Sequence, residues 1–217
     1  MRAMVLEQLG SLLDNPRPLI LRDVPSPDPI AGHVLIRVAA CGVGHTELDE
    51  MERRLPPSAL PRIPGHQVAG RVEDVAGGVD RGVIGARVGV AWIYGACGRC
   101  HACVCGQENL CVAFLATGRD ADGGYAEWMT APADFVFRLP EAIPDDEAAP
   151  LLCAGAIGYR SLQLTNLENG QPLGLTGFGA SAHLVLQMAR ARYPDSPVSV
   201  FARSETERAF ARSLGAE

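Results

Sequence analysis

The sequence has no long hydrophobic run, no excess of positive charge and few aromatic residues, which make up 6% of the chain. Its formal net charge is −6 over 217 residues, so electrostatics does not favour binding to nucleic acid or to an anionic membrane. The apolar residues at the amino terminus are interrupted at Glu7, which predicts neither a signal peptide nor a membrane span. We therefore expect a cytoplasmic protein without nucleic-acid or membrane partners.

Cysteine is present, but its distribution argues against a disulfide framework. The chain has seven cysteines, an odd number, and most of them are crowded between Cys97 and Cys111. Such a group suits metal ligation in a reducing compartment better than disulfide pairing. The remaining composition, with 47% hydrophobic and 20% charged residues, is that of an ordinary globular protein long enough for one large or two modest domains.

The character of the sequence changes once, near residue 150. Before this point, short β-type runs such as residues 33–39 and 68–75 are broken by glycine and proline, which predicts a β-barrel-like domain. From residue 145 onward, longer helical stretches lead into a strand, turn, helix, strand and helix, the order of parallel α/β units. We therefore expect one domain over residues 1–150 and a second over residues 151–217.

The strongest motif is a group of four cysteines spaced C-x2-C-x2-C-x7-C. The four are Cys97, Cys100, Cys103 and Cys111. Four thiolates close a tetrahedral shell around zinc and leave no open coordination position, so we predict a structural zinc lobe over about residues 95–112. His101 and Cys105 lie within this lobe; each either competes as a ligand or faces solvent, and solvent exposure is the favoured interpretation.

A second motif indicates dinucleotide binding. Residues 173–176 read as a buried strand, and Gly177, Gly179 and Ala182 follow with the spacing G-x-G-x-x-A before the helical run His183–Arg192. At a strand-to-helix turn, this spacing brings backbone N–H groups and the positive end of a helix to a pyrophosphate.

The end of the next expected strand, residues 198–201, bears on the choice of cofactor. Enzymes that prefer NAD place an acidic residue there to hold the ribose hydroxyls, whereas this chain has Arg203 and Ser204. A guanidinium and a hydroxyl favour a 2′-phosphate and hence NADP(H). The alternative is that Arg203 is only a solvated charge. Ser204 and Glu207 also form a capping-box pattern that predicts the start of the last helix.

Taken in order, these motifs resemble the zinc-dependent alcohol dehydrogenases of the medium-chain dehydrogenase/reductase superfamily. The cysteine lobe resembles their structural-zinc lobe, and residues 64–67 resemble the G-H-E motif whose histidine, here His66, binds the catalytic zinc. Residues 151–155 resemble the segment with a further zinc ligand, here Cys153. The resemblance implies a GroES-like β-barrel catalytic domain followed by the first part of a Rossmann-type NAD(P)-binding domain, and hydride transfer between a small-molecule alcohol or carbonyl compound and NAD(P).

The segment Cys41–Glu47 resembles the catalytic-zinc loop of that family. The resemblance places His45 near the cofactor pyrophosphate and makes Thr46 the hydroxyl that relays a proton from the alcohol. Gly44 occupies the position at which the family has its cysteine ligand.

Two more departures concern the same chemistry. Gln67 replaces a glutamate of the family motif, and Asp49 stands where relatives usually have a proton-relay histidine. A site of this type pairs two thiolates and an imidazole with Zn²⁺ and keeps one position open. His66 and Cys153 alone leave the cation under-coordinated and positively charged. We therefore expect the catalytic site to bind zinc weakly or not at all.

Three residues near Gly44 are candidates to replace the missing ligand, namely Cys41, Glu47 and Asp49. Carboxylate oxygen is an acceptable zinc donor, but the resemblance gives Glu47 the role of orienting His66. Cys41 precedes Gly44 by three positions, which is too far along an extended strand to reach the same point.

The expected second domain contains only two recognisable strands, whereas a complete fold of this kind has six. We expect the chain to be a fragment or a truncated product, or to be completed by another chain or a homo-oligomer, and to be impaired or inactive alone. Three functions remain open: an alcohol dehydrogenase, a zinc-independent NADPH reductase like the quinone reductase branch of the superfamily, and a non-catalytic zinc-bound module or partner subunit. The four cysteines argue against the second.

Overall fold

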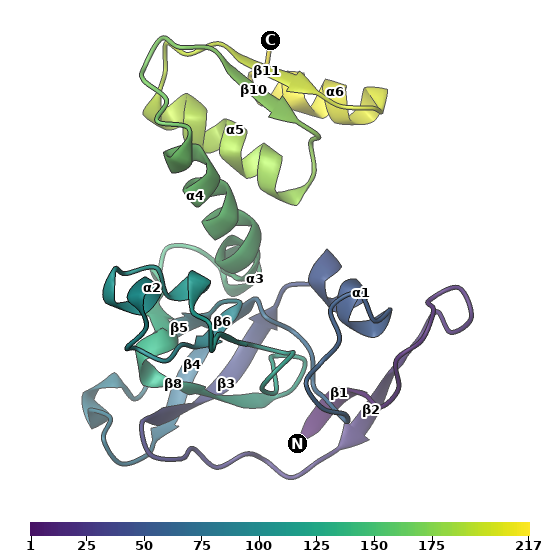
Figure 1. Cartoon of the computed structure of the whole chain (residues 1–217), viewed down its shortest axis with the longest axis vertical. Coiled ribbons are helices and arrows are strands. Elements are labelled where there is room, and N and C mark those ends of the chain that lie inside the picture. The colour runs from purple at the N-terminus through teal and green to yellow at the C-terminus, as the bar shows by residue number, and fades with distance from the viewer. The chain divides into compact units, whose positions relative to one another are not determined.

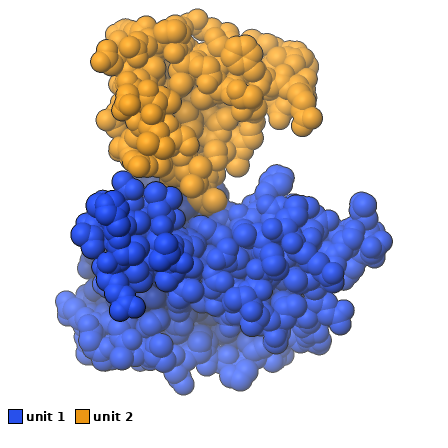
Figure 2. Space-filling model, in the orientation of Figure 1, with its two compact units in different colours: residues 1–152 blue, residues 153–217 orange.

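The computed structural model describes residues 1–217, and the chain forms two compact units, Met1–Leu152 and Cys153–Glu217. Figure 1 traces the secondary structure along the chain and Figure 2 shows the two units in blue and orange. No helix combines the length and the apolar character that crossing a bilayer requires.

The first unit is built on a curled antiparallel sheet of five strands in the order β8-β3-β4-β5-β9. The strands are β3 (His33–Cys41), β4 (Val68–Val75), β5 (Arg87–Val90), β8 (Trp128–Pro132) and β9 (Val136–Arg138). Strand β3 pairs with β4 through two register shifts, and such bulges increase the local twist of a sheet. The predicted β-barrel-like domain is thus confirmed as an antiparallel half-barrel, and both quoted strands are present, β3 being longer than expected.

Valine, isoleucine and methionine side chains fill the inside of this sheet. β-Branched residues suit the pleated, half-buried surface of a strand, and burial of their apolar area stabilises the unit. The buried core consists of Val34, Ile36, Val68, Val72, Val75, Val88, Val90, Met129 and Ala131.

Smaller elements surround the sheet. Two further antiparallel pairs are β1 (Arg2–Leu6) with β2 (Leu19–Asp23), and β6 (Ile93–Gly95) with β7 (Leu115–Ala116). The helices of this unit are α1 (His45–Met51), α2 (His101–Val104) and α3 (Asp145–Pro150), with 3₁₀ turns η1 (Arg81–Val83), η2 (Glu108–Leu110) and η3 (Ala133–Phe135). A π-helical turn, η4 (Leu151–Gly155), follows α3.

A buried arginine fixes α3 to the sheet. Arg87 in β5 donates from Nε to Asp145 Oδ1 at 2.7 Å and also donates to the carbonyl oxygen of Pro140. Ala148 and Ala149 of α3 pack against Ala69 of β4. The small side chains allow close approach, and the ion pair offsets part of the cost of burying the guanidinium.

The second unit contains α4 (Ala156–Leu164), β10 (Leu173–Thr176), α5 (Ala180–Arg192), β11 (Val198–Phe201) and α6 (Glu205–Ser213). Strands β10 and β11 are parallel, with Leu173 opposite Val198. The predicted order of strand, helix, strand and helix is confirmed, and α5 begins at Ala180 rather than at His183. Its buried core consists of Leu162, Leu173, Phe178, Val185, Leu186, Ala189, Val198 and Ala211.

Candidate functional site

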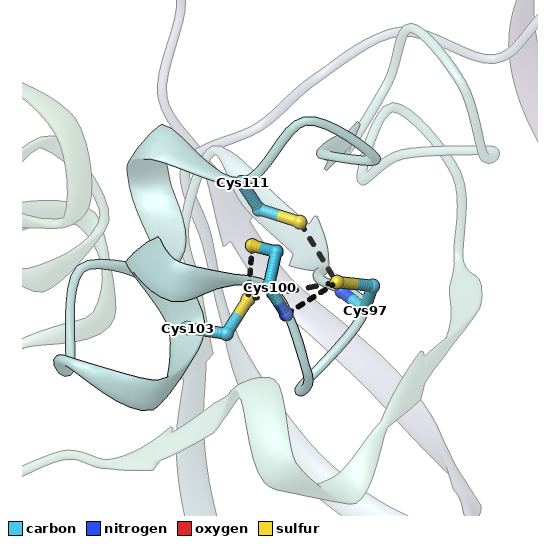
Figure 3. Close-up of side chains that lie close together, drawn as sticks. All are labelled: Cys97, Cys100, Cys103 and Cys111. Carbon is cyan, nitrogen blue, oxygen red and sulfur yellow. Dashed lines mark hydrogen bonds between the residues drawn. The ribbon is translucent and has the colours of Figure 1, made fainter.

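The structure brings the four predicted lobe cysteines together between β6 and β7. Their sulfur atoms all lie within 4.8 Å of one another, and Figure 3 shows the four side chains converging. The Sγ of Cys103 is 3.5 Å from that of Cys100 and 4.0 Å from that of Cys97. A tetrahedral site with Zn–S bonds of about 2.3 Å has sulfur–sulfur separations of about 3.8 Å, so this cluster could hold a metal ion of that size.

Hydrogen bonds within the lobe also favour thiolate forms of its cysteines, which are the forms that bind a cation. The backbone N–H of Cys100 donates to Cys97 Sγ, and the backbone N–H of Cys97 donates to Cys111 Sγ, both at 3.3 Å. Such donors, first that of Arg99 and then that of Cys100, lower the pKa of Cys97 to about 6. Burial raises the pKa of Cys103 to about 12, because crowded thiols do not all ionise without a compensating positive charge.

The two additional donors of the lobe lie apart from this cluster. Cys105 is exposed, and its Sγ is 3.8 Å from His101 Nε2. The group of close donor atoms contains neither residue.

A second constellation centres on His66, a fully buried histidine. His66 Nδ1 lies 2.6 Å from Glu47 Oε1, and both side chains are no more than 2% exposed. Because a carboxylate only accepts, Nδ1 carries the proton of this hydrogen bond and donates it to Glu47. The other oxygen of Glu47 accepts from the backbone N–H of Gly44 at 2.9 Å. Glu47 therefore orients His66, as the family resemblance implied, and it also caps the first turn of α1.

Position 44 lies next to His66. A Cβ atom placed on Gly44 would lie 2.9 Å from Gln67 Nε2, 3.4 Å from Glu47 Oε2 and 3.7 Å from His66 Cε1. The Gln67 amide therefore lies against the space that a side chain at position 44 would enter. Gly44 itself has an extended backbone, with φ −132° and ψ 177°, a conformation open to any residue. The absence of a side chain there is not required by backbone geometry.

Close backbone packing holds the His66 segment in place. A Cβ atom on Gly123 would come within 2.2 Å of the carbonyl oxygen of Gly65, and one on Gly118 within 2.9 Å of the Gly65 nitrogen. The backbone N–H of Gly124 also donates to Gly65 O at 2.9 Å. Glycine is needed here because two backbone segments approach too closely for any side chain.

The structure buries a second carboxylate of α1 that the sequence interpretation missed. Glu50 lies one turn after Glu47 on α1 and is 1% exposed; its Oε2 atom makes no hydrogen bond. Burial, and then the charge of Glu47, raises the pKa of Glu50 to about 8. The i, i+3 spacing from Glu47 was the available signal, because residues so spaced share one face of a helix.

A tryptophan contacts His66, and an arginine lies over that tryptophan. The Trp92 ring meets His66 edge-on at 5.2 Å between centroids, and the Arg119 guanidinium lies 5.5 Å from the Trp92 centroid. Arg119 also pairs with Asp120 at 2.6 Å. Trp92 thus contacts the His66 ring directly.

The other candidate residues between Cys41 and Asp49 contact partners other than His66. Cys41 is half-buried, its thiol donates to the carbonyl oxygen of Gly42, and burial raises its pKa to about 12. Asp49 pairs with Arg54 Nε at 2.5 Å. His45 is exposed and Thr46 half-buried at the start of α1. Of the carboxylates considered as replacements for the missing ligand, Asp49 and Glu47 are thus already paired.

The predicted dinucleotide residues lie at the turn between β10 and α5. Gly177 has φ +79° and nothing would contact a Cβ atom on it or on Gly179. Gly179 is the N-cap of α5, and no side chain caps that end. Ala182 lies in the first turn. The first N–H groups of a helix without a side-chain cap are free to bind an anion.

Arg203 and Ser204, at the end of β11, have different surroundings from each other. Arg203 is exposed. The Ser204 hydroxyl accepts from the backbone N–H of Glu207 at 3.2 Å and donates to Glu207 Oε2 at 2.8 Å, which confirms the capping box. Arg208 donates to the carbonyl oxygens of Ala202 and Arg203 and so stabilises this turn. Cys153, the remaining predicted ligand, lies in the π-helical turn η4, at the start of the second unit.

Comparison with known proteins agrees with this architecture. Residues 30–141 match the alcohol dehydrogenase GroES-like domain. The probable alcohol dehydrogenase AdhA of Mycobacterium tuberculosis is 43% identical over 221 residues, covering 100% of this chain and 63% of the relative. An alcohol dehydrogenase of Geobacillus stearothermophilus is 40% identical, covering 88% of this chain and 55% of the relative. The chain therefore spans less than two thirds of the length of these relatives.

Two solved structures are similar over the whole chain. The CAD of Helicobacter pylori complexed with NADP(H) superposes with a TM-score of 0.88 at 27% identity, covering 100% of this chain and 62% of that chain. A cobalt- and zinc-bound thermostable alcohol dehydrogenase of Pyrobaculum aerophilum gives 0.88 at 27% identity, covering 100% and 64%.

The fold is therefore that of a GroES-like domain followed by the first part of a Rossmann-type domain. The chain belongs to the zinc-type alcohol dehydrogenase family of the medium-chain dehydrogenase/reductase superfamily.

Proposed function

We propose that this chain supplies the catalytic half and the start of the cofactor half of an alcohol dehydrogenase-type oxidoreductase. The reaction moves a hydride from an alcohol carbon to NAD(P)⁺ and releases a proton through the Thr46 hydroxyl, or runs in reverse from a carbonyl compound. The observation that supports it most is the buried His66, held by Glu47 at 2.6 Å in the pocket that position 44 also faces. The family relationship supports the same reaction class.

We propose one structural zinc in the cysteine lobe. Four converging thiol groups with no fifth donor in their cluster match a closed tetrahedral shell. Zinc bound there offsets part of the negative charge of the thiolates and links the ends of the loop, which makes its role structural. The catalytic ligand set implied by the family does not fit in the same way, because Gly44 offers no donor atom and Gln67 lies against its space. No reaction step is therefore assigned to a catalytic zinc.

We expect the chain alone to be a poor alcohol dehydrogenase for this reason. Mixed with NADP⁺ and a panel of primary and aromatic alcohols, it should form NADPH at a rate well below the range of about 1–10³ s⁻¹ that is typical of enzymes. The measurement is NADPH absorbance, with His66→Ala as the comparison. The alternative function, which the absence of a ligand at Gly44 favours, is a non-catalytic zinc-bound module or partner subunit. A rate within that range would contradict the proposed impairment and would also remove support for this alternative.

The cofactor preference follows from Arg203. Its exposed guanidinium lies just past the end of β11, while Ser204 is occupied by the helix cap. Arg203→Ala should lower the affinity for NADPH about tenfold and leave that for NADH nearly unchanged, because a charge-assisted hydrogen bond to phosphate is worth about 1.4 kcal/mol or more. Fluorescence titration with both cofactors measures this. Arg160→Ala removes an exposed charge from α4 as a control, and an equal loss for both cofactors would reject a 2′-phosphate contact.

A further inference from the structure

A cavity of about 340 Å³ in the first unit is lined by β1, the segment after β2, the segment around Arg62, and strands β6 and β8. A cavity of this volume is in the range of about 300–1,000 Å³ that is typical of small-molecule sites. Its lining includes neither His66 nor any cysteine of the lobe. The cavity is therefore distinct from the His66 constellation and the cysteine lobe, and the proposed function does not use it.

Most of the cavity lining is apolar and rigid. The side chains of Ile63 and Met129 are buried, and the aromatic rings of Tyr94 and Trp128 also line the cavity. Three prolines with fixed φ angles complete this part of the lining, namely Pro25, Pro27 and Pro61. A site that is rigid before binding costs little conformational entropy to order, and its aromatic walls suit the ring of a small molecule.

Arg62 is the charged side chain of the lining whose hydrogen bonds are least complete. Antiparallel backbone pairing with Leu6 holds Arg62 in place, and its side chain is 13% exposed. The guanidinium donates from Nη1 to Asp122 Oδ1 at 2.9 Å, and its Nε atom is buried without a hydrogen bond. A guanidinium has five N–H donors, so most of them have no protein acceptor, which is costly for a nearly buried group. A ligand with a hydrogen-bond acceptor would remove part of this cost.

Asp122 offers the complementary group beside Arg62. Its Oδ1 atom accepts from Arg62 and from the backbone N–H of Ile63 at 3.1 Å, whereas its Oδ2 atom accepts no hydrogen bond from the protein. The amino group of Met1, which also lines the cavity, donates to the carbonyl oxygen of Val24 at 2.7 Å. The pair of Arg62 and Asp122 carries no net charge, so a neutral molecule with an acceptor next to a donor would satisfy both side chains.

We propose that this cavity binds a small neutral molecule that has an apolar ring and a hydrogen-bond acceptor next to a donor, as a cyclic amide has. The carbonyl oxygen of the ligand accepts from the Arg62 guanidinium, and its N–H donates to Asp122 Oδ2. The ring of the ligand lies among the apolar and aromatic side chains of the lining. A carboxylate ligand is disfavoured, because it would bring a second negative charge next to Asp122.

The test uses ε-caprolactam as the probe and follows the indole N–H signals of ¹⁵N-labelled protein by NMR. The chain has two tryptophans; Trp128 lines the cavity, whereas Trp92 contacts His66 and serves as an internal control. Caprolactam should shift the Trp128 signal in a saturable way and leave the Trp92 signal in place, and Trp128→Phe assigns the two signals. N-Methylcaprolactam has the same ring and carbonyl group but no N–H, so it should bind about tenfold more weakly.

A pair of variants tests the part played by Arg62. Arg62→Met keeps an unbranched side chain but removes the donors, and it should weaken caprolactam binding about tenfold. Arg71→Met is the matched control, because Arg71 also pairs with a carboxylate, Glu141 at 3.0 Å, but does not line the cavity. It should bind caprolactam as wild type does.

The comparison of the two lactams uses wild-type protein, so it holds even if Arg62→Met fails to fold. The inference is wrong if high millimolar caprolactam does not shift the Trp128 signal, since only water would then occupy the cavity. It is also wrong if both lactams bind equally well, or if a folded Arg62→Met protein binds caprolactam unchanged, since the cavity would then recognise the apolar ring alone.

Discussion

Cys103→Ser should abolish metal binding in the lobe and lower the thermal unfolding midpoint of the chain by about 10 °C. Cys103 is buried and its sulfur lies within 4.0 Å of two partner sulfurs, so its loss leaves a three-thiolate site with a weak fourth ligand. Zinc contributes about 10–16 kcal/mol to the folding of small zinc-finger peptides. Only a part of this, about 3 kcal/mol, is expected here because the lobe is one loop of a larger unit, and that part corresponds to the stated shift.

Metal content and circular dichroism melting, each with and without a chelator, measure this effect. Cys105→Ser is the matched control, because Cys105 is exposed and bonds only weakly to His101. The chelated wild-type protein should melt where Cys103→Ser melts. A Cys103→Ser protein that still holds one ion, or one that melts like wild type, would contradict the structural role of the lobe.

The parts of the fold that the sequence predicted well are those set by local pattern. Strands β4, β10 and β11 begin and end at the predicted residues, because each is a run of apolar and β-branched residues bounded by turn formers. The cysteine lobe is equally local, since its four ligands lie within one short loop and their spacing alone brings them together. The capping box at Ser204 was predictable for the same reason.

What could not be predicted depends on contacts between distant segments. The contact between Arg119 and Trp92 joins residues far apart in the chain, and the sequence gives no sign of it. The sequence does not distinguish Glu50 from the other charged residues of its segment, and only the packing of α1 shows that it is buried. The amide of Gln67 is placed against Gly44 by the approach of the His66 segment to the loop. The family resemblance identified the cysteine ligand that is missing at Gly44, but it did not show that the Gln67 amide lies against that position.

Restoring a thiolate at position 44 should have the largest effect on the His66 pocket. Gly44→Cys should tighten zinc binding beside His66 at least about 100-fold, because it adds the anionic sulfur donor that this position lacks. The backbone at this position accepts any residue. The new side chain would meet Gln67 Nε2 at 2.9 Å, which is the movable end of a flexible side chain, so the amide can rotate away.

Gly44→Ser is the matched control, since it adds nearly the same volume without the thiolate. Competition with a zinc-sensitive dye measures both variants, and equal affinities would mean that position 44 does not reach the cation.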